Sequence, residues 1–164
     1  MASRGVHFAI TQEEYEKLMN IQSDEELINF IQNEFEEKWD EEWLFETDKA
    51  WDAIHRSLTD GKLEWENGIF PLKEVIIGGK NIYKGDDYII SIVTPQNVPI
   101  VAKALEKIDK KILQQGYSQI EQSDYDEEVG EEDFEYTWSS FKGLPQLFSK
   151  ASLAGRAVIF TVDL

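Results

Sequence analysis

The sequence has no cysteine, only two histidines, few prolines and no long apolar run. The absence of cysteine excludes disulfides, thiolate zinc sites and cysteine nucleophiles, and it is typical of proteins from a reducing compartment. No apolar run approaches the roughly 18 residues that a membrane-spanning helix needs. The opening residues, MASRGV, lack the hydrophobic core of a signal peptide. We therefore expect a cytoplasmic protein that does not enter a membrane.

Positive charge is also scarce, since 16 Lys and Arg stand against 33 Asp and Glu, for a net charge of −17. Proteins that bind nucleic acid use Lys and Arg to neutralise phosphates, so this chain should be repelled by DNA, RNA and anionic membrane. Three interpretations of the acidity remain. The charge serves solubility alone, it complements a basic protein partner, or clustered carboxylates bind cations.

Apolar side chains are plentiful, because 41% of the residues are hydrophobic and five Trp, six Tyr and nine Phe are among them. A chain of this length normally forms one domain with a sizeable core. We find no internal repeat and no linker, so we expect a single domain over residues 1–164. Apolar segments at residues 5–10, 87–94 and 157–162 predict N-terminal, central and C-terminal strands. The expected fold class is α+β, a small mixed β-sheet wrapped by five or six helices.

Helix starts are marked by polar caps. Thr11 followed by Glu14 has the form of a capping box, and Ser23 followed by Glu26 repeats it. Apolar residues at helical spacing predict a further long helix over residues 98–112, closed by Gly116. They also predict a helical stretch over 134–154, interrupted near Gly143.

The segment 48–58, DKAWDAIHRSL, predicts a helix that ends before Gly61. His55 is its candidate for chemistry, because Asp48 and Asp52 lie seven and three residues upstream and a carboxylate–imidazole pair can act as a general acid–base couple. The same His55 falls on one apolar helix face with Trp51, so it is better explained as a core residue whose neutral imidazole is satisfied by one or two hydrogen bonds. The catalytic hypothesis for these three residues is therefore weak.

The segment 34–46 mixes acidic residues with aromatic ones. Phe35, Trp39 and Trp43 recur every four residues, which predicts one helical stripe beneath an acidic face. That stripe is either core or a partly exposed surface for a partner, since Trp anchors interfaces well. On the second interpretation the partner-binding residues here are Trp39, Glu41, Glu42 and Trp43.

A second acidic segment spans residues 123–133, where Asp126, Glu127 and Glu128 are further candidates for partner binding. Its acids partly match a calcium-loop template, but Val129 stands where the turn needs glycine and Gly130 follows one position late. We therefore expect a solvated, mobile loop and no metal site. The glycines at Gly78 and Gly79 lack the spacing of phosphate-binding loops, so we expect no cofactor.

The motif Asp-Lys-x-Trp-x-x-x-His, from Asp48 to His55, resembles the YfbM-like family of bacterial proteins, a domain of unknown function. The resemblance extends through the opening Gly-apolar strand, Pro71-Leu72, Gly78-Gly79, Thr94-Pro95 and the closing Gly155-Arg-Ala-Val. It implies an α+β domain with a small mixed sheet wrapped by helices, and it implies no reaction.

The leading functional hypothesis is a non-catalytic, acidic protein-binding domain with a basic protein partner, such as an immunity-type inhibitor of a toxin. The alternative is a small hydrolase or ligand-binding domain with a pocket at Trp51 and His55. A third interpretation is a structural domain whose charge only confers solubility. The first two differ in what they require of His55, because only the hydrolase needs its ring exposed in a cleft.

Overall fold

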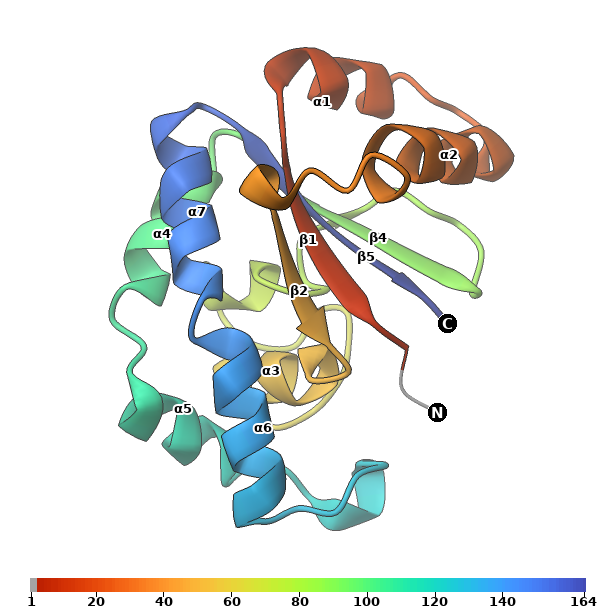
Figure 1. Ribbon diagram of the computed structural model, residues 1–164. Helices are drawn as coiled ribbons and strands as arrows, with labels where there is room; N and C mark the ends of the chain where they lie inside the picture. The colour runs from red at the N-terminus through yellow and green to blue at the C-terminus, as the bar shows by residue number, and fades with distance from the viewer. Residues whose placement is uncertain (1–2) are drawn as a thin grey trace.

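A five-stranded antiparallel sheet lies between two layers of helices in the computed structural model, which describes residues 3–164 (Figure 1). The strands are β1 (Gly5–Ile10), β2 (Leu44–Asp48), β3 (Lys80–Asn81), β4 (Tyr88–Val93) and β5 (Ala157–Asp163). Their order across the sheet is β2-β1-β5-β4-β3, and each neighbouring pair is antiparallel. The α+β class is confirmed, but the expected mixed pairing is not found, because β5 runs between β1 and β4 and opposes both.

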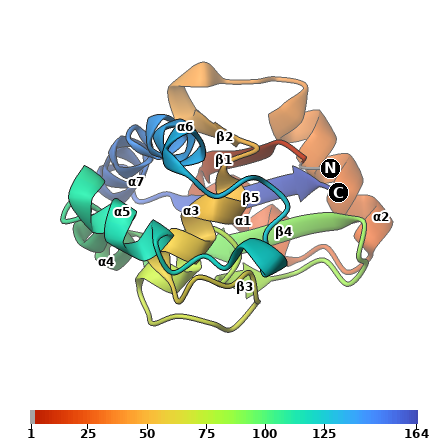
Figure 2. The same cartoon turned by 90° about the horizontal axis from the view of Figure 1, so that it is seen from below.

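Helices cover both faces of this sheet. They are α1 (Gln12–Met19), α2 (Asp24–Ile31), α3 (Trp51–Leu58), α4 (Val98–Leu105), α5 (Lys110–Tyr117), α6 (Glu131–Phe141) and α7 (Leu144–Leu153). Helices α1 and α2 pack on one face, and the other five gather on the opposite face (Figures 1 and 2). No helix within residues 3–164 combines the length and the apolar character that crossing a bilayer requires.

The three central strands, β1, β4 and β5, are buried on both faces because their side chains alternate between the two helix layers. In β1, Phe8 and Ile10 join the core under α1 and α2, whereas Ala9 joins the core under the other helices. Continuous apolar strands at the three predicted positions are therefore confirmed. The two edge strands, β2 and β3, are not evident from the sequence, because they are short and carry charged residues.

Local capping signals proved accurate. The side chain of Thr11 accepts a hydrogen bond from the backbone N–H of Glu14, and the Glu14 carboxylate accepts one from the N–H of Thr11. The predicted long helix over 98–112 is wrong, since α4 ends at Leu105 and α5 begins at Lys110. Asp109 causes the restart, because its carboxylate accepts the N–H of Ile112 and caps the first turn of α5.

The predicted helical stripe of Phe35, Trp39 and Trp43 is also wrong. After α2 the chain makes a π-helical turn over Gln32–Glu36. Trp39 then adopts a left-handed conformation with φ of 43°, and its N–H bonds the carbonyl of Phe35 at 3.0 Å, an arrangement that ends helices. Trp43 lies in a separate 3₁₀ turn, Glu41–Trp43, that leads directly into β2.

Helix α3 starts later than its sequence motif. Asp48 has a left-handed φ of 50° at the end of β2, so it lies outside the helix, which begins at Trp51. The helix is buried around nearly its whole circumference, including Arg56 and Ser57. Its predicted stop is confirmed, since Gly61 has a φ of 91°.

Candidate functional site

His55 lies in the interior of the protein, with only 1% of its surface exposed. Its Nε2 is 2.8 Å from the side-chain oxygen of Asn67. The Asn67 amide nitrogen faces the Asp60 carboxylate and the Lys62 carbonyl, each at 2.7 Å, so the Asn67 oxygen is left to accept the imidazole N–H. Burial lowers the pKa of His55, with the Asn67 hydrogen bond opposing that shift, so the ring is neutral at pH 7.

The two carboxylates that accompany His55 in the sequence have other partners. Oδ1 of Asp52 accepts a hydrogen bond from Nε of Arg56 at 2.5 Å, and burial raises the pKa of Asp52. Asp48, outside the helix, pairs with Arg4 at 3.4 Å. Trp51 is also buried, and its indole N–H donates to the carbonyl of Ser3. These contacts favour a structural role for the segment and offer no support for an acid–base pair at His55.

His7, the second histidine, is fully buried in β1 against Phe148 and Phe160. Its Nε2 lies 2.7 Å from the carbonyl of Val75, so Nε2 carries the proton, and Nδ1 has no hydrogen-bond partner within residues 3–164. Burial lowers the pKa of His7 to about 4, against the Val75 hydrogen bond that raises it. Protonation would therefore place an uncompensated charge in the core.

This burial predicts acid sensitivity. The folded pKa of His7 lies below its unfolded value, so its contribution to stability is complete above about pH 6.5 and is lost as the pH falls toward about 4. From about pH 7 to about pH 5 the free energy of unfolding should fall by about 2 kcal/mol because of this group. Urea titrations of the wild type and of His7→Gln, which can still donate to Val75, will measure it. An equal loss in both proteins would contradict the assignment to His7.

The first acidic and aromatic surface lies around the 3₁₀ turn before β2. Trp39 is 37% exposed and meets Phe8 edge to face, and Glu41 and Glu42 are exposed beside it. Trp43 differs, because its ring lies under two of the chain's own cations. The guanidinium of Arg156 is 3.5 Å and the ammonium of Lys150 is 4.2 Å from its centroid. Trp39 is thus available to a partner, whereas Trp43 is already covered in part.

The second acidic surface is a hollow of about 570 Å³ at the N-terminus of α6. Five carboxylate residues and Tyr136 line it with Val129 and Gly130; the five are Glu127, Glu128, Glu131, Glu132 and Asp133. Asp126 is exposed on the same loop. We name this surface the acidic hollow. Figure 1 shows α6 beginning at the end of the molecule remote from the turn before β2, so the two predicted segments do not form one site.

The loop that carries the acidic hollow is anchored, although the sequence predicts a mobile one. The Gln122 side chain donates to the Glu127 carbonyl at 2.6 Å and accepts the N–H of Val129 at 2.7 Å. Asp133 accepts the hydroxyls of Tyr117 and Tyr125, both at 2.7 Å. The conformation of the loop is therefore held by Gln122 and Asp133, which are not among the residues that the sequence predicted as functional.

Arg56 anchors the same loop from α3. Its guanidinium donates to the Asp124 carboxylate at 2.8 Å and to the Asp124 carbonyl at 2.9 Å, and it lies over the Tyr125 ring. Sequence reasoning missed Arg56, because it lies at i+5 from Trp51, outside the predicted apolar face, where a charged residue is normally solvated. Within residues 3–164, no group of three or more His, Cys, Asp or Glu is arranged to hold a metal ion.

An exposed apolar surface was also missed. Trp65, Ile69 and Phe70 are 46%, 83% and 41% exposed on the loop after α3. Asn67, through its bonds to His55 and Lys62, ties this loop to the core. The signal in the sequence was the presence of Leu63, Trp65, Ile69 and Phe70 among the residues between Gly61 and Pro71, without a sustained helical or strand periodicity.

Comparisons with known proteins agree on the fold and the family. The family model described as a domain of unknown function, DUF1877, matches residues 1–161. No curated protein matches the chain. The crystal structure of YfbM from Escherichia coli, a protein of unknown function, is similar with a TM-score of 0.68 at 16% identity, over 97% of this chain and 99% of that one. The predicted resemblance is confirmed: the chain belongs to the YfbM-like family, a domain of unknown function.

Proposed function

We propose that the chain is a non-catalytic binding protein, acting as a single domain in the cytoplasm, whose acidic hollow receives a basic protein partner. An immunity-type inhibitor of a toxin is one protein of this kind. The observation that supports the proposal most strongly is the concentration of Glu127, Glu128, Glu131 and Glu132 around one concave surface. A concave surface of one charge sign focuses its field and speeds the association of an oppositely charged partner.

The order of the loop strengthens this proposal. Holding like charges together is unfavourable in the free protein, and here Gln122, Arg56 and the tyrosines around Asp133 keep the loop in place. A partner that supplies Lys and Arg would relieve the repulsion between the carboxylates. Binding would not carry the entropic cost of ordering the loop, because the loop is already ordered. Tyr136, 38% exposed beside the carboxylates, offers an aromatic surface over which a guanidinium could stack.

The test neutralises the acidic hollow. The triple variant Glu127→Gln, Glu128→Gln, Glu132→Gln should lose a partner that the wild type retains from its native lysate at low salt. The matched control is Glu16→Gln, Glu25→Gln, Glu26→Gln, which removes the same charge from exposed positions of α1 and α2 and should retain the partner. Moderate salt should release the partner, since exposed charges are screened. Retention that is indifferent to salt, or equal in both triple variants, would contradict the proposal.

The first acidic surface can be examined in the same experiment. The variant Trp39→Ala, Glu41→Gln, Glu42→Gln removes the exposed indole and two carboxylates. Loss of the partner in this variant alone would move the binding site to the turn before β2. Loss in both would indicate a partner that spans the two surfaces.

A further inference from the structure

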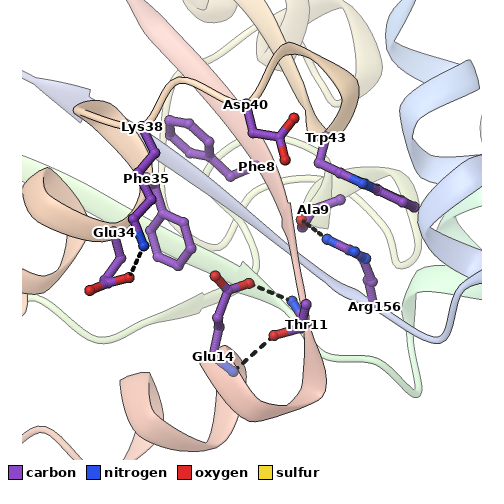
Figure 3. A pocket seen from close by; sticks show the side chains of 10 residues that line it. All are labelled: Phe8, Ala9, Thr11, Glu14, Glu34, Phe35, Lys38, Asp40, Trp43 and Arg156. Atoms are coloured by element: carbon purple, nitrogen blue, oxygen red, sulfur yellow. Dashed lines mark hydrogen bonds and ion pairs between the residues drawn. The ribbon is translucent and has the colours of Figure 1, made fainter.

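A small pocket lies where the end of β1 extends beyond β2 and faces the turn after α2 (Figure 3). Its volume is about 190 Å³. Its lining includes three aromatic side chains, three carboxylates and two cations, namely Phe8, Phe35, Trp43, Glu14, Glu34, Asp40, Lys38 and Arg156. The volume is below the roughly 300 Å³ at which pockets for drug-sized ligands begin, so any ligand must be small.

Arg156 brings an incompletely bonded positive charge to this pocket. Its guanidinium stacks on Trp43 with 3.5 Å between Cζ and the ring centroid, and Nη1 donates to the carbonyl of Ala9 at 3.1 Å. A guanidinium has five N–H donors in a fork that matches a carboxylate. Across residues 3–164 no carboxylate lies within 4 Å of it, although the chain has 33 acidic residues.

The negative charges of the pocket are of two kinds. Glu34 is neutralised by Lys38, whose Nζ lies 2.7 Å away. Glu14 and Asp40 instead accept backbone N–H groups, of Thr11 at 2.8 Å and of Glu42 at 3.2 Å. Those partners are uncharged, and within residues 3–164 neither carboxylate has a cation within 4 Å. A carboxylate can accept about four hydrogen bonds, so both groups have spare acceptor sites. Figure 3 shows them apart from Arg156 around the pocket.

We propose that this pocket binds a small zwitterion of the α-amino acid type. The ligand's carboxylate pairs with the Arg156 guanidinium, and its ammonium group lies toward Asp40 and Glu14. A short side chain packs against Phe8 and Phe35, two of the pocket's three aromatic residues. A simple anion would face two carboxylates, and a simple cation would face the guanidinium, so only a ligand with both charges is complementary. The site is separate from the acidic hollow and does not rest on the proposed function.

Isothermal titration of the full chain with each proteinogenic L-amino acid tests the proposal. Propionate and ethylamine serve as probes that carry one charge each. A small amino acid should bind at least about tenfold more tightly than either probe, because charge-assisted hydrogen bonds form at both of its ends. The proposal is overturned if no amino acid binds, or if propionate or ethylamine binds as tightly as the best amino acid.

Variants assign the binding to the pocket. Arg156→Gln and Asp40→Asn should each lower the affinity for the amino acid at least about tenfold. Arg4→Gln and Asp86→Asn are controls that make the same charge changes at exposed positions outside the pocket, and they should leave binding unchanged. Should circular dichroism show that Arg156→Gln does not fold, the exposed Asp40→Asn still decides the question. Unaltered binding in Asp40→Asn overturns the proposal.

Discussion

Replacement of Arg56 by alanine should lower the free energy of unfolding by about 4 kcal/mol, the loss typical when one partner of a buried ion pair is removed. Only 5% of the Arg56 side chain is exposed, and its guanidinium bonds Asp52, Asp124 and the carbonyl of Gly61. Truncation leaves the Asp52 carboxylate, whose pKa burial already raises, without the cation that keeps it ionised. It also removes the aliphatic stem that fills space beside α3.

Two further variants separate the contributions to this effect. Arg56→Lys keeps the charge but cannot bond Asp52 and Asp124 with one planar fork, so an intermediate loss is expected. Asp124→Asn should cost less, about 1 kcal/mol, because its carboxylate is more than half exposed and solvent screens the pair. Urea unfolding followed by tryptophan fluorescence measures all three. If the free energy of unfolding of Arg56→Ala lies within about 1 kcal/mol of the wild-type value, the ion pairs of Arg56 with Asp52 and Asp124 contribute little net stability.

Replacement of Gly116 by alanine should lower the free energy of unfolding by about 3 kcal/mol, at the upper end of what overpacking normally costs. Gly116 lies inside α5, where an added Cβ would clash with the backbone carbonyl oxygen of Ser57 in α3. Backbone cannot give way as a flexible side chain can, so the two helices would have to separate. Helix propensity alone predicts the opposite sign, a gain of about 1 kcal/mol for Gly→Ala in a helix.

The chain supplies a matched control for Gly116. A Cβ at Gly130 meets nothing within 4 Å, and the backbone there is extended, with a φ of 167°. Gly130→Ala should therefore change stability by less than about 0.5 kcal/mol. Thermal and urea unfolding of the two variants compare them directly. A Gly116→Ala protein as stable as Gly130→Ala would mean that α3 and α5 adjust at no cost, contrary to the packing described above.

Gly116 also shows where reading the sequence fell short. In the sequence it marks the end of the helix predicted over 98–112, because glycine commonly follows a helix. In the structure α5 does end one residue past Gly116, at Tyr117, but the glycine also permits a close approach between α5 and α3 that the sequence did not indicate. A pattern of spacing cannot distinguish a glycine that ends a helix from one that another helix contacts.

For the candidate functional residues, the sequence predicted exposure correctly but did not predict their contacts. The exposure of Trp39, Glu41 and Glu127 agrees with the sequence hypothesis, since charged segments rarely become buried. The sequence could not decide whether Asp52 pairs with His55 or with Arg56. Asp52 lies three residues before His55 and four before Arg56, and both spacings allow a side-chain contact on a helix. Likewise, the sequence predicts Trp43 as an anchor for a partner, but the two cations that cover its ring are Lys150 of α7 and Arg156, which immediately precedes β5.

The sequence by itself determined the three central strands, the capped starts of α1 and α2 and the stop at Gly61, because these depend on interactions among residues a few positions apart. Only the tertiary structure decided the antiparallel strand order, the anchoring of the acidic loop by Arg56 and the burial of both histidines. It also brought Arg156 to the pocket beside β1. These features depend on contacts between segments far apart in the chain, where many arrangements satisfy the same local pattern and overall packing selects one.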